Sequence, residues 1–176
     1  MNRFVIISGC SGGGKSTLLS ELDRRGHGVV EEPGRRIVAE ELAGTGDALP
    51  WVDTAAFARR AIAMSLRDRE EAAKRRGWIF FDRGLIDAAA ALEYATRTPV
   101  VVNYAAERFF RRVFITPPWR EIYVNDADRR HTFQDAVAEY ERLLTAFATL
   151  DYTVDVLPKI GVAERADIVL EHLRLT

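Results

Sequence analysis

A glycine-rich loop near the start of the chain carries the residues whose spacing is most specific for chemistry. Residues 9–16 read Gly-Cys-Ser-Gly-Gly-Gly-Lys-Ser and match the pattern G-x-x-x-x-G-K-[ST] in full. Glycines let the backbone turn its N–H groups inward without a clash from a Cβ atom. The lysine supplies a positive charge for the β- and γ-phosphates of a nucleotide, and the final serine supplies a hydroxyl for Mg²⁺. The loop therefore predicts a site for the phosphates of a nucleotide and for Mg²⁺.

Each position of this loop has an expected part in nucleotide binding. An apolar run before it and a helical pattern after it place the loop at a helix N-terminus, which adds partial positive charge. We expect Lys15 to be catalytic as well, and Ser16 to bind Mg²⁺. Cys10 is either a reactive thiol whose pKa the helix terminus lowers, or a small residue at a tolerant position, and the second interpretation is favoured. The predicted nucleotide-binding residues are Gly9, Cys10, Ser11, Gly12, Gly13, Gly14, Lys15, Ser16 and Thr17.

Acidic residues followed by arginine end two further apolar runs. Residues 31–36 read Glu-Glu-Pro-Gly-Arg-Arg, and residues 81–84 read Phe-Asp-Arg-Gly. In open α/β sheets the ligand lies outside the carboxyl ends of the strands. A carboxylate there can organise Mg²⁺ or accept a proton, and an arginine can neutralise a migrating phosphoryl group. The alternative is that Glu31, Glu32 and Asp82 are solvated strand-end acids or helix caps.

Short apolar runs alternate with helical patterns along the chain, which is typical of an α/β fold. We expect a three-layer P-loop NTPase fold, with a five-stranded parallel sheet flanked by helices and an arginine-bearing lid loop. Thr132 and Asp135 predict a capping box, and the helix behind them has a predicted buried stripe of Phe133, Val137, Tyr140, Leu144 and Phe147. The expected strands are 3–8, 28–31, 78–81, 113–116 and 153–157. The other expected helices are 15–25, 35–43, 54–75, 85–96, 103–111 and 162–173.

The segment after the fourth expected strand is polar, broken by proline and rich in arginine. We expect a lid over approximately residues 117–131, because a mobile loop can exclude water from phosphoryl transfer. Arginine binds phosphate oxygens in a bidentate manner, so Arg120, Arg129 and Arg130 are candidates, and Arg129 is the predicted catalytic residue. The alternative is a solvated surface run, partly balanced by neighbouring acids.

Composition limits the classes of function. A length of 176 residues with 48% hydrophobic and 29% charged side chains indicates one ordered domain, over residues 1–176. The net charge of −1 disfavours bulk attraction to nucleic acid or to anionic lipid, and no run is long enough to predict a membrane span. A single cysteine excludes an internal disulfide and favours the cytoplasm. The sequence leaves a homodimer possible.

The order of these short motifs resembles the P-loop small-molecule kinases. Glu32-Pro33-Gly34 is similar to the E-P-G run of thymidylate kinases and to the E-P run of deoxynucleoside kinases, and Asp82-Arg83 is similar to their D-R or E-R pair. The overall layout most resembles the nicotinamide riboside kinase-like ATP-binding domains, of the AAA type. Their features have counterparts in Glu32 to Arg35, in Asp82, Arg83 and Asp87, in Pro117-Pro118-Trp119, and in Leu157-Pro158 followed by Glu164-Arg165.

This resemblance implies a kinase that transfers the γ-phosphate of Mg-ATP to a small molecule, such as a nucleoside, a nucleotide or a related compound. It implies that Glu32, Arg35, Arg83 and Asp87 bind the acceptor and that Lys15, Asp82, Arg83, Glu32 and Arg129 are catalytic. Asp82 is the expected base or Mg²⁺ ligand, and Glu32 the expected acceptor-binding residue, although the two roles can be exchanged. Trp51, Phe57 and Arg60 either shape the acceptor pocket or pack in the core, and packing is favoured.

Two alternatives remain open at this point. One is a nucleotide-binding regulatory module that hydrolyses ATP slowly and acts on a partner protein. The other is a phosphotransferase for a non-nucleoside hydroxyl compound, which would differ only in its acceptor pocket. A GTPase switch is disfavoured because the chain lacks the N/T-K-x-D motif that reads guanine.

Overall fold

Five parallel strands form one sheet, in the order β2-β3-β1-β4-β5. The computed structural model describes residues 2–122 and 132–174. The strands are β1 (Phe4–Gly9), β2 (Gly28–Val30), β3 (Ile79–Asp82), β4 (Arg112–Thr116) and β5 (Thr153–Val156). The α-helices are α1 (Lys15–Arg24), α2 (Pro33–Ala43), α3 (Thr54–Ala73), α4 (Leu85–Thr96), α5 (Phe133–Thr149) and α6 (Val162–Arg174), and two short 3₁₀ turns are η1 (Val101–Tyr104) and η2 (Arg120–Ile122).

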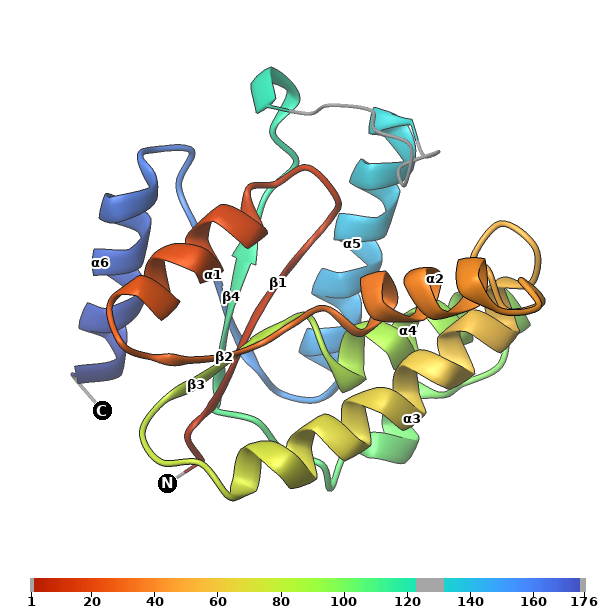
Figure 1. The fold of residues 1–176 in the computed structure, drawn as a ribbon. Helices are drawn as coiled ribbons and strands as arrows, with labels where there is room; N and C mark the ends of the chain where they lie inside the picture. Colours follow the sequence, from red (N-terminus) through yellow and green to blue (C-terminus); the bar gives the residue numbers. More distant parts are fainter. Residues whose placement is uncertain (1, 123–131, 175–176) are drawn as a thin grey trace.

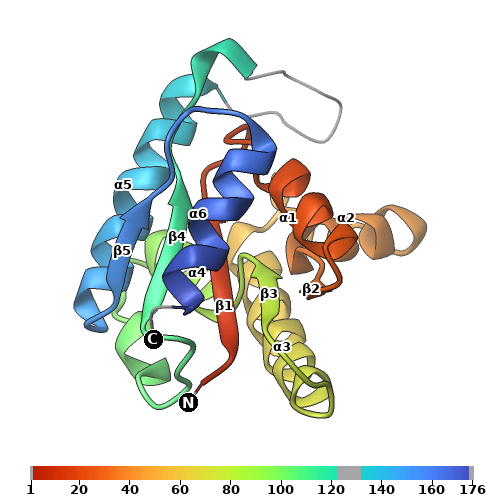
Figure 2. The ribbon, with the colours of Figure 1, turned by 90° about the vertical axis from the view of Figure 1, so that its left-hand side faces the viewer.

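Helices cover both faces of this sheet and make the three layers that the sequence predicts (Figures 1 and 2). Successive residues of β1 face opposite layers, so Val5 and Ile7 enter one core and Ile6 enters the other. The first core includes Leu22 of α1 and buried residues of α6. The second core includes Phe147 of α5 and buried residues of α3 and α4. All of β3 is buried, as expected for a strand that is covered on both faces.

The prediction of a helix over residues 103–111 is wrong. Only the short turn η1 forms there, and the chain after it runs irregularly to β4. Phe109 belongs to the core beneath α3–α5, whereas its neighbour Phe110 belongs to the core beneath α1 and α6. Adjacent residues on a helix are only about 100° apart and cannot reach opposite faces of a sheet. The backbone N–H of Phe110 instead donates to the carbonyl of Phe4 at 2.7 Å.

Helix α5 confirms its predicted capping box but presents a different face to the core. The Thr132 hydroxyl accepts from the N–H of Asp135, and the Asp135 carboxylate accepts from the N–H of Thr132. The fully buried positions are Ala136, Leu143, Ala146 and Phe147, while Tyr140 and Leu144 are only half-buried. The helix is therefore rotated relative to the predicted stripe.

Strand register brings the chemistry-bearing loops to one edge of the sheet. Strand β1 lies between β3 and β4, with Ile7 opposite Asp82 and Gly9 opposite Thr116. The loop after β1 therefore begins beside the carboxyl end of β3. Crevices at the carboxyl ends of such sheets are the usual ligand sites of open α/β folds.

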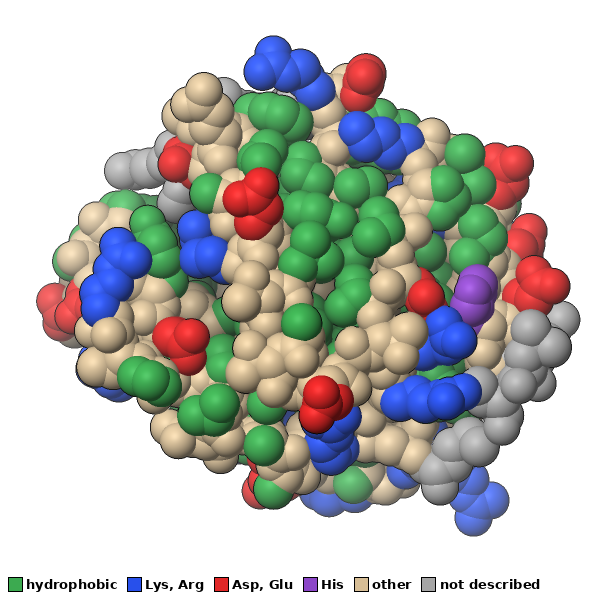
Figure 3. All heavy atoms as spheres, turned by 180° about the vertical axis from the view of Figure 1, so that it is seen from behind, with side chains coloured by type: hydrophobic (Ala, Val, Ile, Leu, Met, Phe, Trp, Pro, Cys, Tyr) green, Lys and Arg blue, Asp and Glu red, His purple; other side chains and the backbone are tan. Residues whose placement is uncertain are grey.

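Figure 3 shows the molecule from behind, on the side of the edge strand β5. Apolar side chains gather in the middle of this face. The exposed apolar residues include Val156, which is 53% exposed, and Ile160, which is 37% exposed.

In residues 2–122 and 132–174, none of the helices combines the length and the apolar character that crossing a membrane requires.

Candidate active site

The phosphate loop joins the end of β1 to the start of α1 and is closely packed against β4. Gly9 has a φ of +126°, and a Cβ atom there would lie 2.4 Å from the carbonyl oxygen of Thr116. A Cβ atom on Gly13 would lie 2.5 Å from the Thr116 hydroxyl. Any side chain at these two positions would therefore push the loop away from the sheet.

Lys15 is buried at the first position of α1 and folds back over the loop. Its Nζ donates to the carbonyl oxygens of Gly9 at 2.9 Å and of Cys10 at 2.7 Å. Burial, followed by the nearby charge of Arg83, lowers the pKa of Lys15. Two carbonyl acceptors hold the ammonium group in place, and no carboxylate of residues 2–122 and 132–174 pairs with it directly. An anion bound in the loop would stabilise its charged form.

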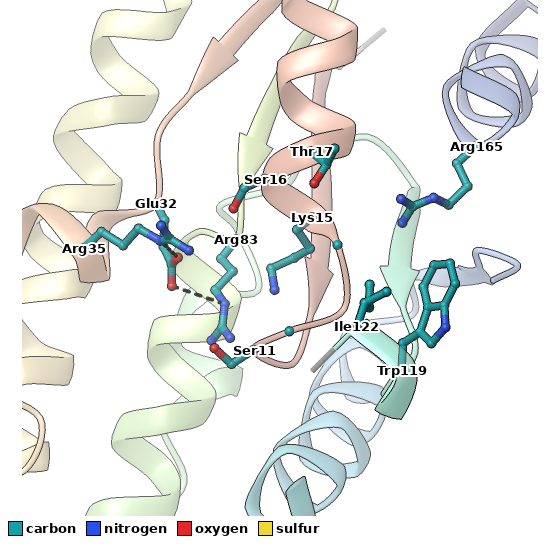
Figure 4. A pocket seen from close by; sticks show the side chains of 12 residues that line it. Ser11, Lys15, Ser16, Thr17, Glu32, Arg35, Arg83, Trp119, Ile122 and Arg165 are labelled. Carbon is teal, nitrogen blue, oxygen red and sulfur yellow. Dashed lines mark hydrogen bonds and ion pairs between the residues drawn. The ribbon is translucent and has the colours of Figure 1, made fainter. Parts of the chain in front are cut away.

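A cleft of about 360 Å³ opens beside the loop (Figure 4). Ser16 and Thr17, both exposed, line it from the first turn of α1. In Figure 4 the side chains of Glu32 and Arg83 lie on one side of Lys15, and those of Trp119 and Arg165 lie on the other side. We call this cavity the phosphate cleft, and it is lined by Ser11, Gly12, Gly14, Lys15, Ser16, Thr17, Glu32, Arg35, Arg83, Trp119, Ile122 and Arg165.

Asp82 ends β3 as a buried carboxylate with an unused oxygen. Its Oδ1 atom is buried and accepts no hydrogen bond from the residues that the structure describes. Burial, and then the negative charge of Glu32, raises the pKa of Asp82 to about 6. Asp82 and Ser16 line a second cleft, of about 490 Å³, which Glu32 also lines.

These residues fit Mg²⁺ only when a phosphate chain is also present. The unused oxygen of Asp82 and the exposed hydroxyl of Ser16 are the kind of hard oxygen ligand that Mg²⁺ prefers. Within residues 2–122 and 132–174, however, no group of three or more His, Cys, Asp or Glu side chains is arranged to hold a metal. The remaining ligands would have to be phosphate oxygens and water, which is the usual mode of Mg²⁺ binding with nucleotides.

Arg83 follows Asp82 and lies between two acids. Its backbone adopts a φ of +60°, a left-handed conformation that is uncommon for a residue with a side chain. Its Nη1 donates to Glu139 at 2.5 Å, and its Nε lies 3.4 Å from a carboxylate oxygen of Glu32. Burial opposes the charge, but Glu139 and Glu32 outweigh burial and raise the pKa of Arg83. Strain of this kind is characteristic of functional sites, where surrounding contacts hold the residue in place.

Glu139 is a site residue that the sequence analysis did not identify. It lies on α5, three residues after the buried Ala136 and four before the buried Leu143, so it faces the sheet edge. Its Oε2 accepts the backbone N–H of Ser11 in the phosphate loop at 3.4 Å. Burial acts to raise the pKa of Glu139, but the Arg83 guanidinium outweighs it and the pKa is lowered. An acid on the buried face of a helix would have indicated a site residue. The predicted buried stripe lay on a different side of this helix, so Glu139 was not recognised.

Glu32 and Asp87 border a small third cavity between α2, α3 and α4. The cavity measures about 70 Å³, and its walls include Phe57 and small residues of α3 and α4. Asp87 is buried, its Oδ1 accepts from the Ser8 hydroxyl at 2.5 Å, and its Oδ2 has no hydrogen-bond partner. Burial raises the pKa of Asp87 to about 6. Glu32 also pairs with the exposed Arg35, at 3.2 Å.

Arg165 and Trp119 form the opposite wall, and their contribution was also missed. Arg165 belongs to α6 and is only 5% exposed, and its guanidinium carbon lies 5.5 Å from the centroid of the Trp119 ring. Burial lowers the pKa of Arg165, and no ion pair joins it to an acid in the described part of the chain. Its Nη1 lies 3.5 Å from the Gly13 carbonyl oxygen. A planar cation beside an indole makes a surface on which a flat base can stack.

Several other expected residues either line none of these clefts or lie outside the described residues. Arg129, the predicted catalytic arginine of the lid, lies outside the described residues, as does Arg130. Arg120 is exposed, with its guanidinium 4.9 Å from the ring of Phe133. Arg60 pairs with Glu40 and Glu41 and, like the exposed Trp51, lines none of the three clefts. Of Trp51, Phe57 and Arg60, which all belong to the described part of the chain, Phe57 alone lines one of the three clefts.

Cys10 is fully buried beneath the loop. Burial raises the pKa of its thiol, although the charge of Lys15 opposes that effect. A buried, protonated thiol is a poor nucleophile. The geometry therefore supports the interpretation of Cys10 as a small packing residue.

Comparison with known proteins places this arrangement among P-loop kinase folds. A family model described as an AAA domain matches residues 4–165. Deoxyadenosine kinase from M. mycoides with bound dATP superposes with a TM-score of 0.62 at 16% identity, covering 98% of this chain and 99% of that one. The same kinase with the products dCMP and a flexible dCDP gives 0.57 at 15% identity, covering 97% and 98%.

A second kinase has a similar fold. Shikimate kinase from Acinetobacter baumannii in complex with shikimate superposes with a TM-score of 0.58 at 14% identity, and the match covers 99% of this chain and 93% of that one. No curated protein sequence matches this chain. The identities are low, so these structures establish the fold, which agrees with the expected α/β class.

Proposed function

The chain belongs to the AAA domain family, and from this premise we propose that it is an ATP-dependent kinase for a small hydroxyl-bearing molecule. The observation that carries the proposal is the common border of the clefts. Glu32 lines both the phosphate cleft and the small third cavity, and Arg83 lines both as well. An acceptor in the small cavity would thus meet a triphosphate across an acid and an arginine, which is the arrangement that phosphoryl transfer requires.

The nucleotide side consists of the loop amides, Lys15 and the first turn of α1. The loop residues from Gly9 to Gly14 would bind phosphate oxygens through their N–H groups, as helix N-termini and glycine-rich loops do. Lys15 would turn from the carbonyls it now contacts toward the β- and γ-phosphates. Ser16 and Asp82 would hold Mg²⁺, which neutralises charge on the phosphates when it is bound.

The transfer itself needs a proton acceptor and a cation. The acceptor hydroxyl oxygen forms a bond to the γ-phosphorus while the bond from that phosphorus to the ADP oxygen breaks. The hydroxyl proton passes to Asp82 or to Glu32, both of which are near Arg83. Asp82, with a pKa of about 6, is ionised at neutral pH and can take this part. Arg83 would stabilise charge on the phosphoryl group in flight.

Charge in the acceptor cavity favours an uncharged substrate over a monophosphate. Glu32 and Asp87 are hydrogen-bond acceptors, so they suit the hydroxyl or amino groups of a ligand. The two nearby cations, Arg35 and Arg83, already pair with Glu32. Phe57 offers an apolar wall on which a ring can pack. The structural neighbours act on a nucleoside and on shikimate, and both have free hydroxyl groups, so we propose a nucleoside or a compound of similar polarity.

The decisive experiment measures ADP release from Mg-ATP in the presence of individual acceptors. The panel contains nucleosides, the matching nucleoside monophosphates, and non-nucleoside hydroxyl compounds including shikimate. We expect at least one uncharged acceptor to raise the rate well above that without acceptor, and each monophosphate to do so less. If no small molecule stimulates turnover but a protein does, the kinase proposal is wrong. We further propose a cytoplasmic location, which the single buried cysteine supports.

A further inference from the structure

The carboxylate of Glu139, on α5, lies against the phosphate loop at a position that suits an anion. One of its carboxylate oxygens accepts the backbone N–H of Ser11, and the other accepts from Arg83 at 2.5 Å. Ser11 and Arg83 both line the phosphate cleft, and in Figure 4 the Arg83 side chain extends toward Ser11. The carboxylate therefore joins the two types of group, a loop amide and an arginine, that a phosphate oxygen would use.

The charges around the loop explain why an acid is stable at this position. Lys15 is buried close to the loop, the Arg83 side chain is only 18% exposed, and both cations lower the pKa of Glu139. Arg83 also pairs with Glu32, but without a bound anion and without Glu139 the Lys15 ammonium group and the Ser11 amide would have less negative charge beside them, at a cost in free energy. Glu139 is only partly exposed, with 28% of its side chain accessible, so water screens these interactions incompletely.

We propose that the Glu139 carboxylate takes the place of a phosphate in the nucleotide-free protein. There it binds Arg83 and the Ser11 amide, and it releases both groups when a triphosphate binds. The inference depends on only one part of the proposed function, the binding of phosphates in the loop. It assigns Glu139 as a positioning residue, because it acts on the reacting groups through Arg83. Its carboxylate competes with the incoming phosphates for the same donors, so it weakens binding while it keeps the empty site ordered.

A charge-neutral variant separates this role from a structural one. Glu139→Gln keeps the size of the side chain and one oxygen acceptor but removes the negative charge. We expect it to bind inorganic tripolyphosphate and Mg-ATP about three- to tenfold more tightly than the unmodified protein. We also expect its melting temperature without ligand to fall, because Arg83 loses its shorter ion pair, with Glu139, and keeps the longer one with Glu32. If Glu139 only supported the fold, its substitution would lower the melting temperature without strengthening the binding of either ligand.

The measurement is isothermal titration calorimetry with tripolyphosphate and with Mg-ATP, combined with thermal unfolding of the empty protein. Glu141→Gln is the matched control, because it makes the same charge change on an exposed residue of the same helix, and it should leave both affinities unchanged. Equal or weaker binding by Glu139→Gln, with normal binding by the unmodified protein, would overturn this inference alone. Failure of both proteins to bind either probe would overturn it together with the proposed function. Binding without transfer to any acceptor would affect only the kinase proposal.

Discussion

Asp82 and Asp87 are buried acids at the carboxyl end of β3 and the start of α4, and each keeps one oxygen without a hydrogen-bond partner. Burial raises the pKa of both to about 6. A buried carboxylate without full hydrogen bonding lowers stability, so its presence suggests a use other than folding. In the proposed kinase that use is to bind Mg²⁺ or take a proton at Asp82 and to bind the acceptor at Asp87.

Replacing Asp82 should therefore stabilise the protein while removing its chemistry. Below about pH 3 the carboxyl group is largely protonated in both the folded and the unfolded states, so it contributes little difference. As the pH rises toward 6 the unfolded state loses its proton first, and the folded state of the unmodified protein becomes progressively less stable. The stability advantage of Asp82→Asn over the unmodified protein, measured as free energy of unfolding, should therefore be about 1–3 kcal/mol larger at pH 7.5 than at pH 4.

Urea unfolding at both pH values measures this difference. Asp47→Asn, at an exposed position, is the control and should show the same stability as the unmodified protein at both. Mg-ATP should still bind to Asp82→Asn, because the loop and Lys15 are intact, whereas acceptor-dependent turnover should be lost. A variant that is destabilised equally at both pH values would show that Asp82 is a structural residue.

At the scale of elements, local signals predicted what local interactions decide. The loop from Gly9 to Ser16 and the capping box at Thr132 depend on residues within a few positions of each other, and both were predicted. The helix expected over residues 103–111 failed because Phe109 and Phe110 are drawn to cores on opposite faces of the sheet. That choice depends on partners far away in the chain, which a local pattern does not contain.

Helix α6 illustrates an element whose functional contribution depends on such distant packing. Its Arg165 reaches the phosphate loop only because α6 packs against α1 in the same core. If Arg165 and Trp119 provide a surface for the base, Arg165→Met should weaken Mg-ATP binding about tenfold. This is the magnitude of a well-desolvated cation–π contact. Tripolyphosphate, which has no base, should bind with unchanged affinity.

Calorimetry with both ligands makes this comparison within one variant, so intact tripolyphosphate binding also shows that the loop is folded. Arg24→Met, on the exposed side of α1, is the matched control for the loss of a positive charge. Equal losses for the two ligands would contradict a base-stacking role and would indicate that Arg165 acts on the phosphates instead.

At the scale of the molecule, the candidate site collects residues from β3 and from several helices around one loop. Glu32 precedes α2, Asp87 belongs to α4, Glu139 to α5 and Arg165 to α6. The end of the second expected strand indicated Glu32, and the resemblance to P-loop kinases indicated Asp87. No motif was recognised around Glu139. Arg165 belongs to the Glu164-Arg165 motif of the kinase resemblance, but that motif assigned it no place in the site, and only the three-layer packing brings both residues to the loop.

A final prediction concerns the whole chain as one cooperative unit. A ligand that binds only the folded state stabilises it by about 2.7 kcal/mol at a concentration 100 times its dissociation constant. For a domain of this size, that corresponds to a rise in melting temperature of roughly 5–10 °C. We expect this rise with Mg-ATP in a single calorimetric transition, and we expect Lys15→Ala to lose it, because the buried ammonium group no longer meets the phosphates. The comparison uses the ligand-induced shift, since removing Lys15 can itself change the baseline. Two separate transitions would contradict a single domain, and an undiminished shift in Lys15→Ala would place the nucleotide elsewhere.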